Sequence, residues 1–438
     1  MAAAGGKGGG RALGVWSALA LVVGNMIGSG IYLLPATLAP LGANAMIGWI
    51  VTIAGAMSLA FVFARLAAAV PAAGGPYAFA RAAFGPGVGF AVAWSYWVLI
   101  WAGNGAVAVA VVSALSVPFP ALTGATAAMA MAMALIWGLV GVNIGGVGLA
   151  GRVQVVTTIA KLLPLAGVIL LAAWLLLRDG GAAVAGNPPV PVTSGAIAGA
   201  AALTFWGFLG VESATVPADK VEDAARVVPL VTLAGTALTG LVYICVAGAV
   251  ALLLPVAAVG GSPAPVAVFL GRTFGAGTGE VVALFAAISA FGALNGFIML
   301  QGEMPWAMAR GGVFPAWLGL ESARGTPARA HFVSGVLVTI VMALNYGERT
   351  GNLFADIAAI SLAAGMLAYF ASALAALRLL RGDRAVRAAA VVAAGFVAWM
   401  VWGLGLKADL WGLALLALGL PVYWSVRRAP LTVARRDR

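Results

Sequence analysis

Long apolar segments alternate with short polar or Gly- and Pro-rich connections along almost the whole chain. A helix of about 20 apolar residues, within a range of about 17–25, is long enough to cross a bilayer. The segments that reach this length lie at about 12–36, 41–66, 87–114, 123–147, 154–177, 195–216, 228–254, 279–308, 329–345, 353–377, 386–406 and 409–426. This pattern predicts an all-α membrane protein with 12 transmembrane helices and both chain ends on the same side.

The composition supports this prediction and excludes a soluble protein. Hydrophobic residues make up 63% of the 438 residues and charged residues only 8%, whereas soluble domains contain about 25% charged residues. The single cysteine, Cys245, allows no intramolecular disulfide, and a single histidine, His331, argues against a histidine-based metal site or proton relay. The chain also shows no nucleophile–base cluster. We therefore expect no metal, no cofactor and no enzymatic activity.

Positive charge lies mostly on one side of the predicted helices. Of the 24 Lys and Arg residues, only Arg178, Arg272, Arg349 and Lys407 fall on the side opposite the N-terminus, and Lys161 lies inside a span. Lys and Arg concentrate in cytoplasmic loops of membrane proteins. The distribution predicts a cytoplasmic N-terminal tail, 1–11, and a basic cytoplasmic tail, 427–438, that meets anionic lipid headgroups. It explains the net charge of +11 without nucleic acid.

The first apolar segment is interrupted at its centre by residues 24–30, GNMIGSG. Glycine weakens a helix, and backbone groups freed at membrane depth survive only where they are buried in protein or line a cavity. We interpret residues 23–30 as the break of a discontinuous helix, whose N–H groups can hold a carboxylate and whose carbonyls can hold an ammonium. The alternative is that the glycines only let helices pack closely.

A second interruption lies in the sixth span, at residues 206–213, WGFLGVES, where a carboxylate stands beside paired glycines. Each interrupted span opens a set of five. Two matched broken helices indicate an inverted-repeat transporter with its substrate site at mid-membrane. The repeats would cover 12–178 and 195–378, and the last two spans, 386–426, would lie outside them.

Three stretches carry a resemblance to a known family: GNMIGSGIYLLPA at 24–36, PAAGGPYAFARAAF at 71–84 and WGFLGVES at 206–213. The chain resembles the amino acid–polyamine–organocation superfamily, and within it the bacterial arginine/agmatine antiporter and related basic amino acid/polyamine antiporters, over about 13–427. The resemblance implies a leucine-transporter-type fold of five plus five inverted repeats, alternating access, and a place in the bacterial inner membrane.

The resemblance also assigns roles around the two breaks. The Ser29 hydroxyl and the Gly30 amide would hold the substrate carboxylate, and the carbonyls of Met26, Trp206 and Leu209 would hold its α-ammonium. The indole of Trp206 would cover the bound substrate. The other residues that would line the pocket are Asn25, Tyr96, Leu99, Ile100, Asn104, Phe297 and Ser361. Positions 96, 100 and 104 share one helical face by their spacing.

Three positions would control gating or coupling: Lys161, Glu212 and Tyr369. Glu212 is either a pH-sensitive gate or a hydrogen-bond partner of the broken backbone, and Asn104 either contacts substrate or bonds between helices. An ionisable residue in mid-span is costly and functional by default. Lys161 would fill the sodium position of sodium-coupled relatives, where it tethers span 1 to span 5 or releases a proton, or it makes a purely structural contact. Glu303, near the end of span 8, is interpreted as an interfacial or helix-packing residue.

The substrate class follows from the resemblance and from departures from it. Phe297 stands where the arginine/agmatine pattern has Trp, bulkier Leu99 and Ile100 replace smaller residues, and Lys161 replaces a small apolar residue. We expect an exchanger of basic amino acids or their amines. Lys161 and the apolar wall favour the alternative, a proton-coupled or exchanging transporter of neutral amino acids. A non-transporting sensor or a channel is a remoter alternative. Expected partners are the amino acid or amine, protons, membrane lipids and a second copy in a homodimer.

Overall fold

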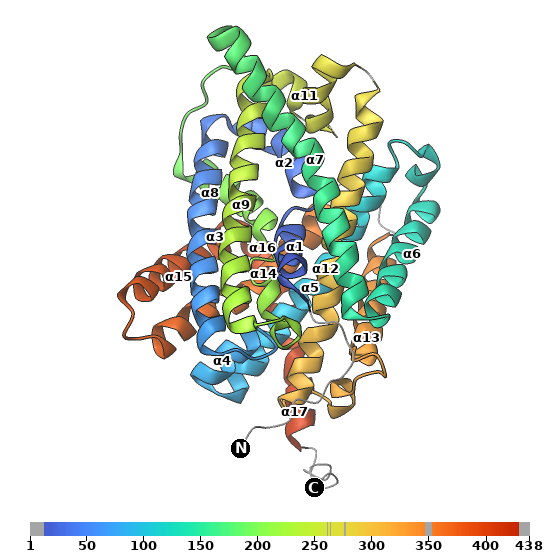
Figure 1. The fold of residues 1–438 in the computed structure, drawn as a ribbon, viewed down its shortest axis with the longest axis vertical. Coiled ribbons are helices and arrows are strands. Elements are labelled where there is room, and N and C mark those ends of the chain that lie inside the picture. The colour runs from blue at the N-terminus through green and yellow to red at the C-terminus, as the bar shows by residue number, and fades with distance from the viewer. Residues whose placement is uncertain (1–12, 261, 263, 276, 347–352, 429–438) are drawn as a thin grey trace.

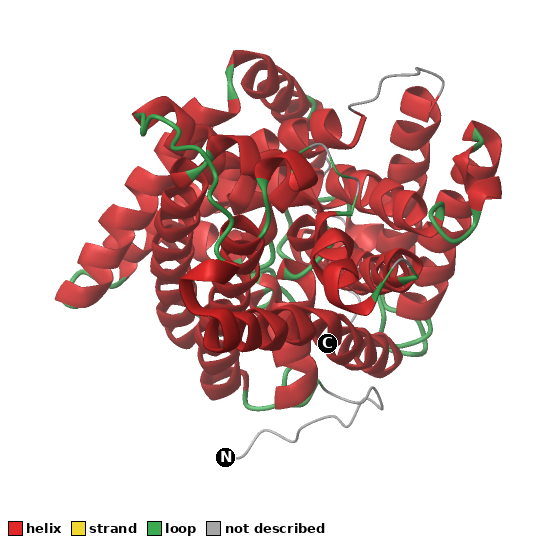
Figure 2. Cartoon of the chain, turned by 90° about the horizontal axis from the view of Figure 1, so that it is seen from above, coloured by secondary structure: helices red, strands yellow, loops and turns green. Residues whose placement is uncertain are grey.

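The computed structural model describes residues 13–428 except 261, 263, 276 and 347–352, and this part of the chain is built from helices (Figure 1). Figure 2 shows only helix and loop in it, and the single β-type pairing is a bridge between Leu13 and Val221. The predicted tail 1–11 and all but the first two residues of the predicted tail 427–438 lie outside the described residues.

The helices follow one another with short connections. In chain order they are α1 (Val15–Met26), α2 (Gly30–Leu38), α3 (Ala43–Ala69), α4 (Pro76–Phe84), α5 (Pro86–Leu115), α6 (Ala125–Ile144), α7 (Val147–Asp179), α8 (Ser194–Phe205), α9 (Ala224–Leu253), α10 (Val256–Val259), α11 (Pro265–Phe274), α12 (Thr278–Arg310), α13 (Ala328–Tyr346), α14 (Leu353–Leu379), α15 (Arg384–Leu404), α16 (Leu406–Ala417) and α17 (Gly419–Arg428).

Eleven helical stretches in the described residues are long and apolar enough to cross a membrane. They include the pair α1–α2, counted together as Val15–Leu41, and α8 with the turns after it, Ser194–Thr215. The span predicted at 329–345 corresponds to α13, whose part Ala328–Ala343 counts among the shorter apolar helices. The prediction of an all-α protein with many spans is confirmed, whereas the twelfth span and the repeats stay predictions.

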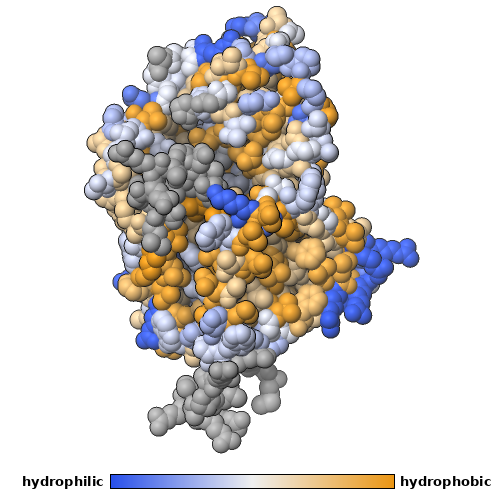
Figure 3. Space-filling model, turned by 180° about the vertical axis from the view of Figure 1, so that it is seen from behind, coloured by the Kyte–Doolittle hydropathy of each residue, from blue (hydrophilic) through white to orange (hydrophobic). Residues whose placement is uncertain are grey.

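Apolar side chains cover much of the outer surface. Leu177, Trp16 and Leu170 are 88%, 74% and 70% exposed. Figure 3 shows apolar residues spread over the middle of one face, with hydrophilic residues mainly toward its ends and along one projecting edge. Large apolar patches are rare on soluble monomers. This surface fits a protein whose sides face lipid.

The first break lies at the centre of the bundle. Helix α1 packs against α7, α9 and α12, and it stands in the middle of Figure 1. It ends at Met26, and α2 begins at Gly30. The break is narrower than the predicted 23–30, because Gly24 is still helical. A Cβ at Gly24 would collide with the side chains of Gln154 and Thr158, so this glycine serves close packing against α7.

The second break follows α8. The helix ends at Phe205, a 3₁₀ turn covers Trp206–Phe208, and turns continue to a second 3₁₀ turn at Ser213–Thr215. Gly210 lies at φ +106°, a conformation that residues with a Cβ rarely adopt. The sequence predicted this break correctly, and its backbone leaves the helix beside the end of α1.

Candidate substrate site

A small cavity lies between the two breaks and the helices α5 and α12. Its volume is about 30 Å³, enough for one or two water molecules. The structure therefore shows this site in a closed conformation, which must widen to hold an amino acid. The lining residues are Asn25, Met26, Gly28, Ser29, Gly30, Leu99, Ile100, Gly103, Val107, Trp206, Gly207, Leu209, Ala293 and Phe297.

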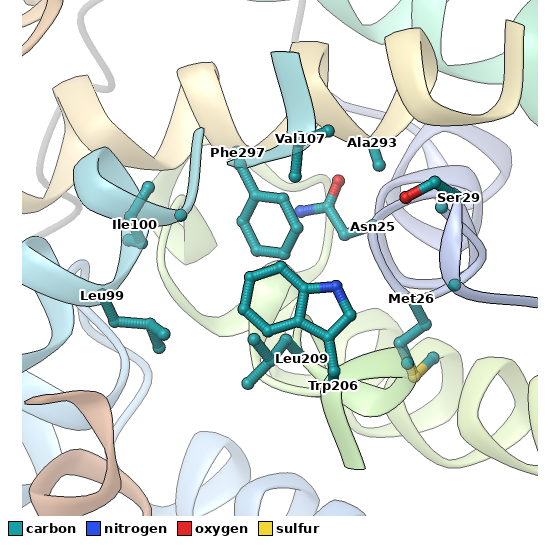
Figure 4. Close-up of a pocket in the computed structure, with 14 residues that line it drawn as sticks. Asn25, Met26, Ser29, Leu99, Ile100, Val107, Trp206, Leu209, Ala293 and Phe297 are labelled. Atoms are coloured by element: carbon teal, nitrogen blue, oxygen red, sulfur yellow. The ribbon is translucent and has the colours of Figure 1, made fainter. Parts of the chain in front are cut away.

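The lining has a polar side and an apolar side. Figure 4 shows the rings of Trp206 and Phe297 lying next to each other, with Leu99 and Ile100 on one side of them and Ser29 on the other. The polar groups are the side chain of Ser29, the carboxamide of Asn25 and the backbone of the two breaks. The side chains that line the cavity include no carboxylate and no cation.

Most of the predicted pocket residues meet at this cavity: Asn25, Met26, Ser29, Gly30, Leu99, Ile100, Trp206, Leu209 and Phe297. The structure places three others away from the lining, because each has a hydrogen-bond partner elsewhere. The Tyr96 hydroxyl donates to Glu212 Oε1 at 2.6 Å. Asn104 Nδ2 donates to Gln301 Oε1 at 2.7 Å, and Ser361 Oγ donates to the Ala358 carbonyl at 3.0 Å.

One tyrosine that the sequence analysis missed joins the two breaks. The Tyr243 hydroxyl lies 2.6 Å from the Met26 carbonyl oxygen and 3.0 Å from that of Gly207. A hydroxyl has one proton, so the two carbonyls share it or take it in turn. The Met26 carbonyl also accepts from the Gly28 N–H at 2.9 Å. A substrate ammonium at Met26 would therefore compete with groups already bonded there.

Lys161 lies directly behind the first break. It is fully buried, and its Nζ donates to the carbonyls of Gly24 at 2.7 Å and Ile27 at 2.6 Å. Ser289 Oγ lies on the opposite helix, 3.1 Å from the Ile27 carbonyl and 2.9 Å from that of Gly28. The carbonyls freed at the end of α1 thus accept hydrogen bonds from side chains of α7 and α12. Lipid could not supply such donors, so these side chains allow the break to exist at membrane depth.

Glu212 ties the second break to two long helices. Its side chain is fully buried and accepts from Tyr96 of α5 at 2.6 Å and from Tyr369 of α14 at 2.9 Å. It does not line the cavity. The three predicted residues Tyr96, Glu212 and Tyr369 therefore form one buried cluster next to the cavity, on the side where the chain leaves the break.

A chain of buried amides supports Asn25 from behind. Asn25 Nδ2 donates to Ser213 Oγ at 2.8 Å, and its Oδ1 accepts from Gln154 Nε2 at 3.4 Å. Gln154 Oε1 accepts from Asn295 Nδ2 at 2.9 Å, and Asn295 Oδ1 accepts from Asn143 Nδ2 at 3.3 Å. The sequence analysis missed these amides, although their only signal, a polar residue inside an apolar segment, was present.

Comparison with known proteins identifies the family of the chain. Residues 13–422 match the model of the amino acid permease family. The chain belongs to this family. The permease is thus a multi-pass membrane transporter rather than an enzyme, and the resemblance to the amino acid–polyamine–organocation superfamily is confirmed.

Three relatives of the permease are named as antiporters. The cadaverine/lysine antiporter of Escherichia coli K12 is 34% identical over 369 residues, 83% of this chain and 82% of the relative. The arginine/ornithine antiporter of Pseudomonas aeruginosa is 31% identical over 413 residues, 89% of this chain and 85% of the relative. The putative arginine/ornithine antiporter of Bacillus subtilis is 30% identical over 358 residues, 74% of this chain and 75% of the relative.

Gly296 offers a direct test of the amide chain. A Cβ at this position of α12 would overlap the carboxamide of Asn25, and forcing extra atoms into a packed interior costs about 1–3 kcal/mol. We expect Gly296→Ala to turn Asn25 away and to lower kcat/KM of the permease for its substrate by about tenfold, which corresponds to about 1.4 kcal/mol.

The measurement is initial exchange rate against substrate concentration in proteoliposomes. Gly279→Ala is the matched control, because it lies on the same helix and a Cβ there meets nothing within 4 Å. Equal kcat/KM for the wild type and Gly296→Ala, at equal protein incorporation, would show that Asn25 needs no such positioning.

Proposed function

We propose that the permease is an antiporter of basic amino acids that exchanges one such substrate for another, or for its amine, by alternating access. The observation that carries this proposal is the similarity along more than four fifths of the chain to antiporters whose names give lysine, cadaverine, arginine and ornithine as substrates. These substrates all carry a positively charged side chain or a second ammonium.

We propose the family architecture for the whole chain: 12 spans, with repeats at 12–178 and 195–378 and a final pair at 386–426. The two breaks support it, because they interrupt the first helix of each half. The Lys and Arg distribution supports cytoplasmic termini in the inner membrane. In Figure 1, α4 and α17 lie at one end of the molecule and α11 at the other, as this orientation requires.

In the proposed binding mode the substrate lies between the two breaks. Its carboxylate meets the Ser29 hydroxyl and the Gly30 N–H at the start of α2, where the helix dipole favours negative charge. Its α-ammonium meets the carbonyls of Met26, Trp206 and Leu209, once the cavity has widened and the Tyr243 proton has moved to Gly207. The indole of Trp206 then covers the substrate.

For the side chain, two rings are available. Trp206 and Phe297 both line the cavity, and aromatic faces attract a guanidinium or ammonium by about 0.5–2 kcal/mol. Phe binds a cation less well than Trp. Asn104 lies one helical turn from Ile100 on α5, and the Ser361 hydroxyl of α14 lies beside Gly103. Both would reach the substrate side chain in the wider state.

Exchange of neutral amino acids is the second candidate function. It is favoured by the apolar wall formed by Leu99, Ile100 and Val107 and by the lack of any carboxylate in the lining. A fixed positive charge on Lys161 behind the break would also disfavour a second cation. In both readings Lys161, Glu212 and Tyr369 control the rocking of the repeats, and Lys161 is the group that a coupled proton would use.

The decisive experiment is counterflow in proteoliposomes. Labelled lysine, arginine and alanine are offered to vesicles preloaded with each amino acid, with cadaverine, with agmatine or with buffer alone. We expect labelled lysine or arginine to accumulate only in vesicles that contain a basic substrate. Accumulation of alanine against internal alanine, without any response to lysine or arginine, would overturn the basic assignment and support the neutral one. Binding without flux would overturn both.

A further inference from the structure

A second cavity lies at the α4 end of the molecule, on the far side of the second break from the substrate site. Its volume is about 530 Å³, much larger than that of the central cavity. It is bounded by the end of α3, by α4 and by the end of α12. Its floor is apolar and aromatic, with Val70, Tyr77 and Trp306, and two arginines line it, Arg81 and Arg310.

The loop between α3 and α4, which contributes Ala72 and Ala73 to the cavity lining, touches the segment that follows the second break. The Gly74 N–H donates to the Val216 carbonyl at 2.8 Å, and Gly75 packs against Thr215. Lys220 Nζ lies 4.9 Å from the centre of the Trp306 ring. A substrate that passes the Glu212 cluster toward the α4 end would therefore arrive beside this cavity.

The two guanidinium groups are held in place and keep their charge available. Arg81 Nη1 donates to the Tyr77 hydroxyl at 2.6 Å and to the Gly311 carbonyl at 2.5 Å. The Arg310 guanidinium lies 5.7 Å from the centre of the Trp306 ring. Within residues 13–428 as described, the ion pairs involve Arg65, Arg178 and Lys220, and neither Arg81 nor Arg310 has one. The Asp219 carboxylate is close enough to feel the charge of Arg310, but it forms no ion pair with it.

Two guanidinium groups above an aromatic floor are suited to a small carboxylate. Guanidinium matches carboxylate in shape and can bond it through two N–H groups. The aromatic and apolar floor can take the aliphatic part of an amino acid. A diamine such as cadaverine has two ammonium groups and no carboxylate, so the same arginines would repel it.

We propose that this cavity is a waiting site that captures amino acids from the cytoplasm by their carboxylate. The inference rests on the proposed exchange function and on the proposed orientation. It also narrows that function: the substrate loaded from the cytoplasm keeps its carboxylate, so the exchange is amino acid for amino acid rather than amino acid for diamine.

The test compares the two faces of the membrane. Exchange is measured in inside-out vesicles, which present the cytoplasmic face, and in right-side-out vesicles, which present the other face. The variants are Arg81→Gln, Arg310→Gln and the double variant. Arg324→Gln is the matched control, because Arg324 is exposed in the loop after α12 and does not line the cavity. Unlabelled cadaverine is tested as a competitor of labelled lysine.

In the wild type we expect lysine to bind more tightly than cadaverine at the cytoplasmic face. The KM for lysine measured there should therefore be lower than the inhibition constant of cadaverine measured there. Both arginines are exposed, and exposed charge pairs contribute little individually, so each single variant should raise the cytoplasmic KM for lysine about two- to fivefold and the double variant about tenfold. The KM at the other face and the maximal rate should stay unchanged. Inhibition by cadaverine should stay the same or become stronger, because the variants remove positive charges that repel it, and Arg81→Lys should restore part of the affinity for lysine.

Three results would overturn the waiting site. The first is an unchanged cytoplasmic KM in the double variant at equal expression. The second is an equal weakening of lysine and cadaverine, which would indicate a general change in conformation. The third appears when the vesicles are made with and without anionic lipid: a wild-type rate that depends on anionic lipid, and a double variant that loses only this dependence, would assign the arginines to lipid headgroups. None of these results affects exchange itself, whereas a wild type without counterflow would contradict the proposed function.

Discussion

Replacing Lys161 with alanine is expected to lower exchange by about ten- to a hundredfold at equal protein in the membrane. Among the described residues Lys161 is the only side-chain donor to the Gly24 carbonyl, whereas the Ile27 carbonyl also has Ser289. A buried acceptor left without its donor costs about 1–3 kcal/mol, and each 1.4 kcal/mol is a factor of about ten. The break would then relax into geometries that no longer present Ser29 and Gly30 to a substrate.

The same variant separates the two roles predicted for Lys161. If it tethers α7 to the break, exchange falls in Lys161→Ala with or without a pH gradient. If it serves only as a proton donor, counterflow at equal pH persists and only uptake driven by the gradient disappears, which would contradict the tether. Leu163→Ala is the control, because that residue of α7 is 60% exposed. Thermal unfolding in detergent shows whether each variant is folded.

The two breaks and Lys161 could be predicted because each conflicts with its own surroundings. Glycines, an Asn and a Lys inside apolar segments conflict with an uninterrupted membrane helix, and this conflict is visible in a single segment. The family followed from the same residues and is confirmed. The predicted length of the first break was less accurate, because it included Gly24, which is helical. This glycine allows close contact with Gln154 and Thr158, and the sequence does not show which helix lies opposite.

Groups that act across long sequence distances could not be predicted. Tyr243 reaches Met26 over 217 positions, and Ser289 reaches Ile27 over 262. A tyrosine or serine in an apolar segment gives no sign of its partner. The same reason applies to Tyr96: its spacing indicates the face of α5 that it shares with Ile100, but its bond to Glu212 depends on where the second break lies. Helical spacing indicates a direction, and only packing gives the neighbour.

Glu303 is buried rather than interfacial, which leaves the helix-packing alternative and adds an ion-pair partner that the sequence did not show. Its side chain is 2% exposed and accepts from Lys220 Nζ at 2.6 and 2.8 Å. Lys220 lies just after the second break, and its carbonyl accepts from the Leu13 N–H at 2.7 Å. The pair thus fastens the end of α12 to the segment after the second break and, through Leu13, to the segment before α1. The hydropathy pattern predicted that Glu303 lies near the end of a span, but it could not predict Lys220 as its partner.

We expect Glu303→Ala to destabilise the permease by about 3–5 kcal/mol, because removing one partner of a buried ion pair leaves an uncompensated charge. Lys220, at 13% side-chain exposure, would then stand beside Trp306 without its carboxylate. Thermal unfolding in detergent, followed with a reporter of folded protein, measures the loss. Glu280→Ala is the control, because this carboxylate lies in the first turn of the same helix, outside the ion pairs of the described chain.

The double variant Lys220→Met/Glu303→Met distinguishes stability from gating. Replacing a whole buried pair by apolar residues of similar volume is often neutral or stabilising, so the double variant should unfold at or above the wild-type temperature. If the pair also holds the α4 end of the molecule closed, the stable double variant should still exchange more slowly, because under the proposed alternating access both segments part and reclose in each cycle. Wild-type exchange in the double variant would limit the pair to a structural role, and wild-type stability in Glu303→Ala would show that water already screens Lys220.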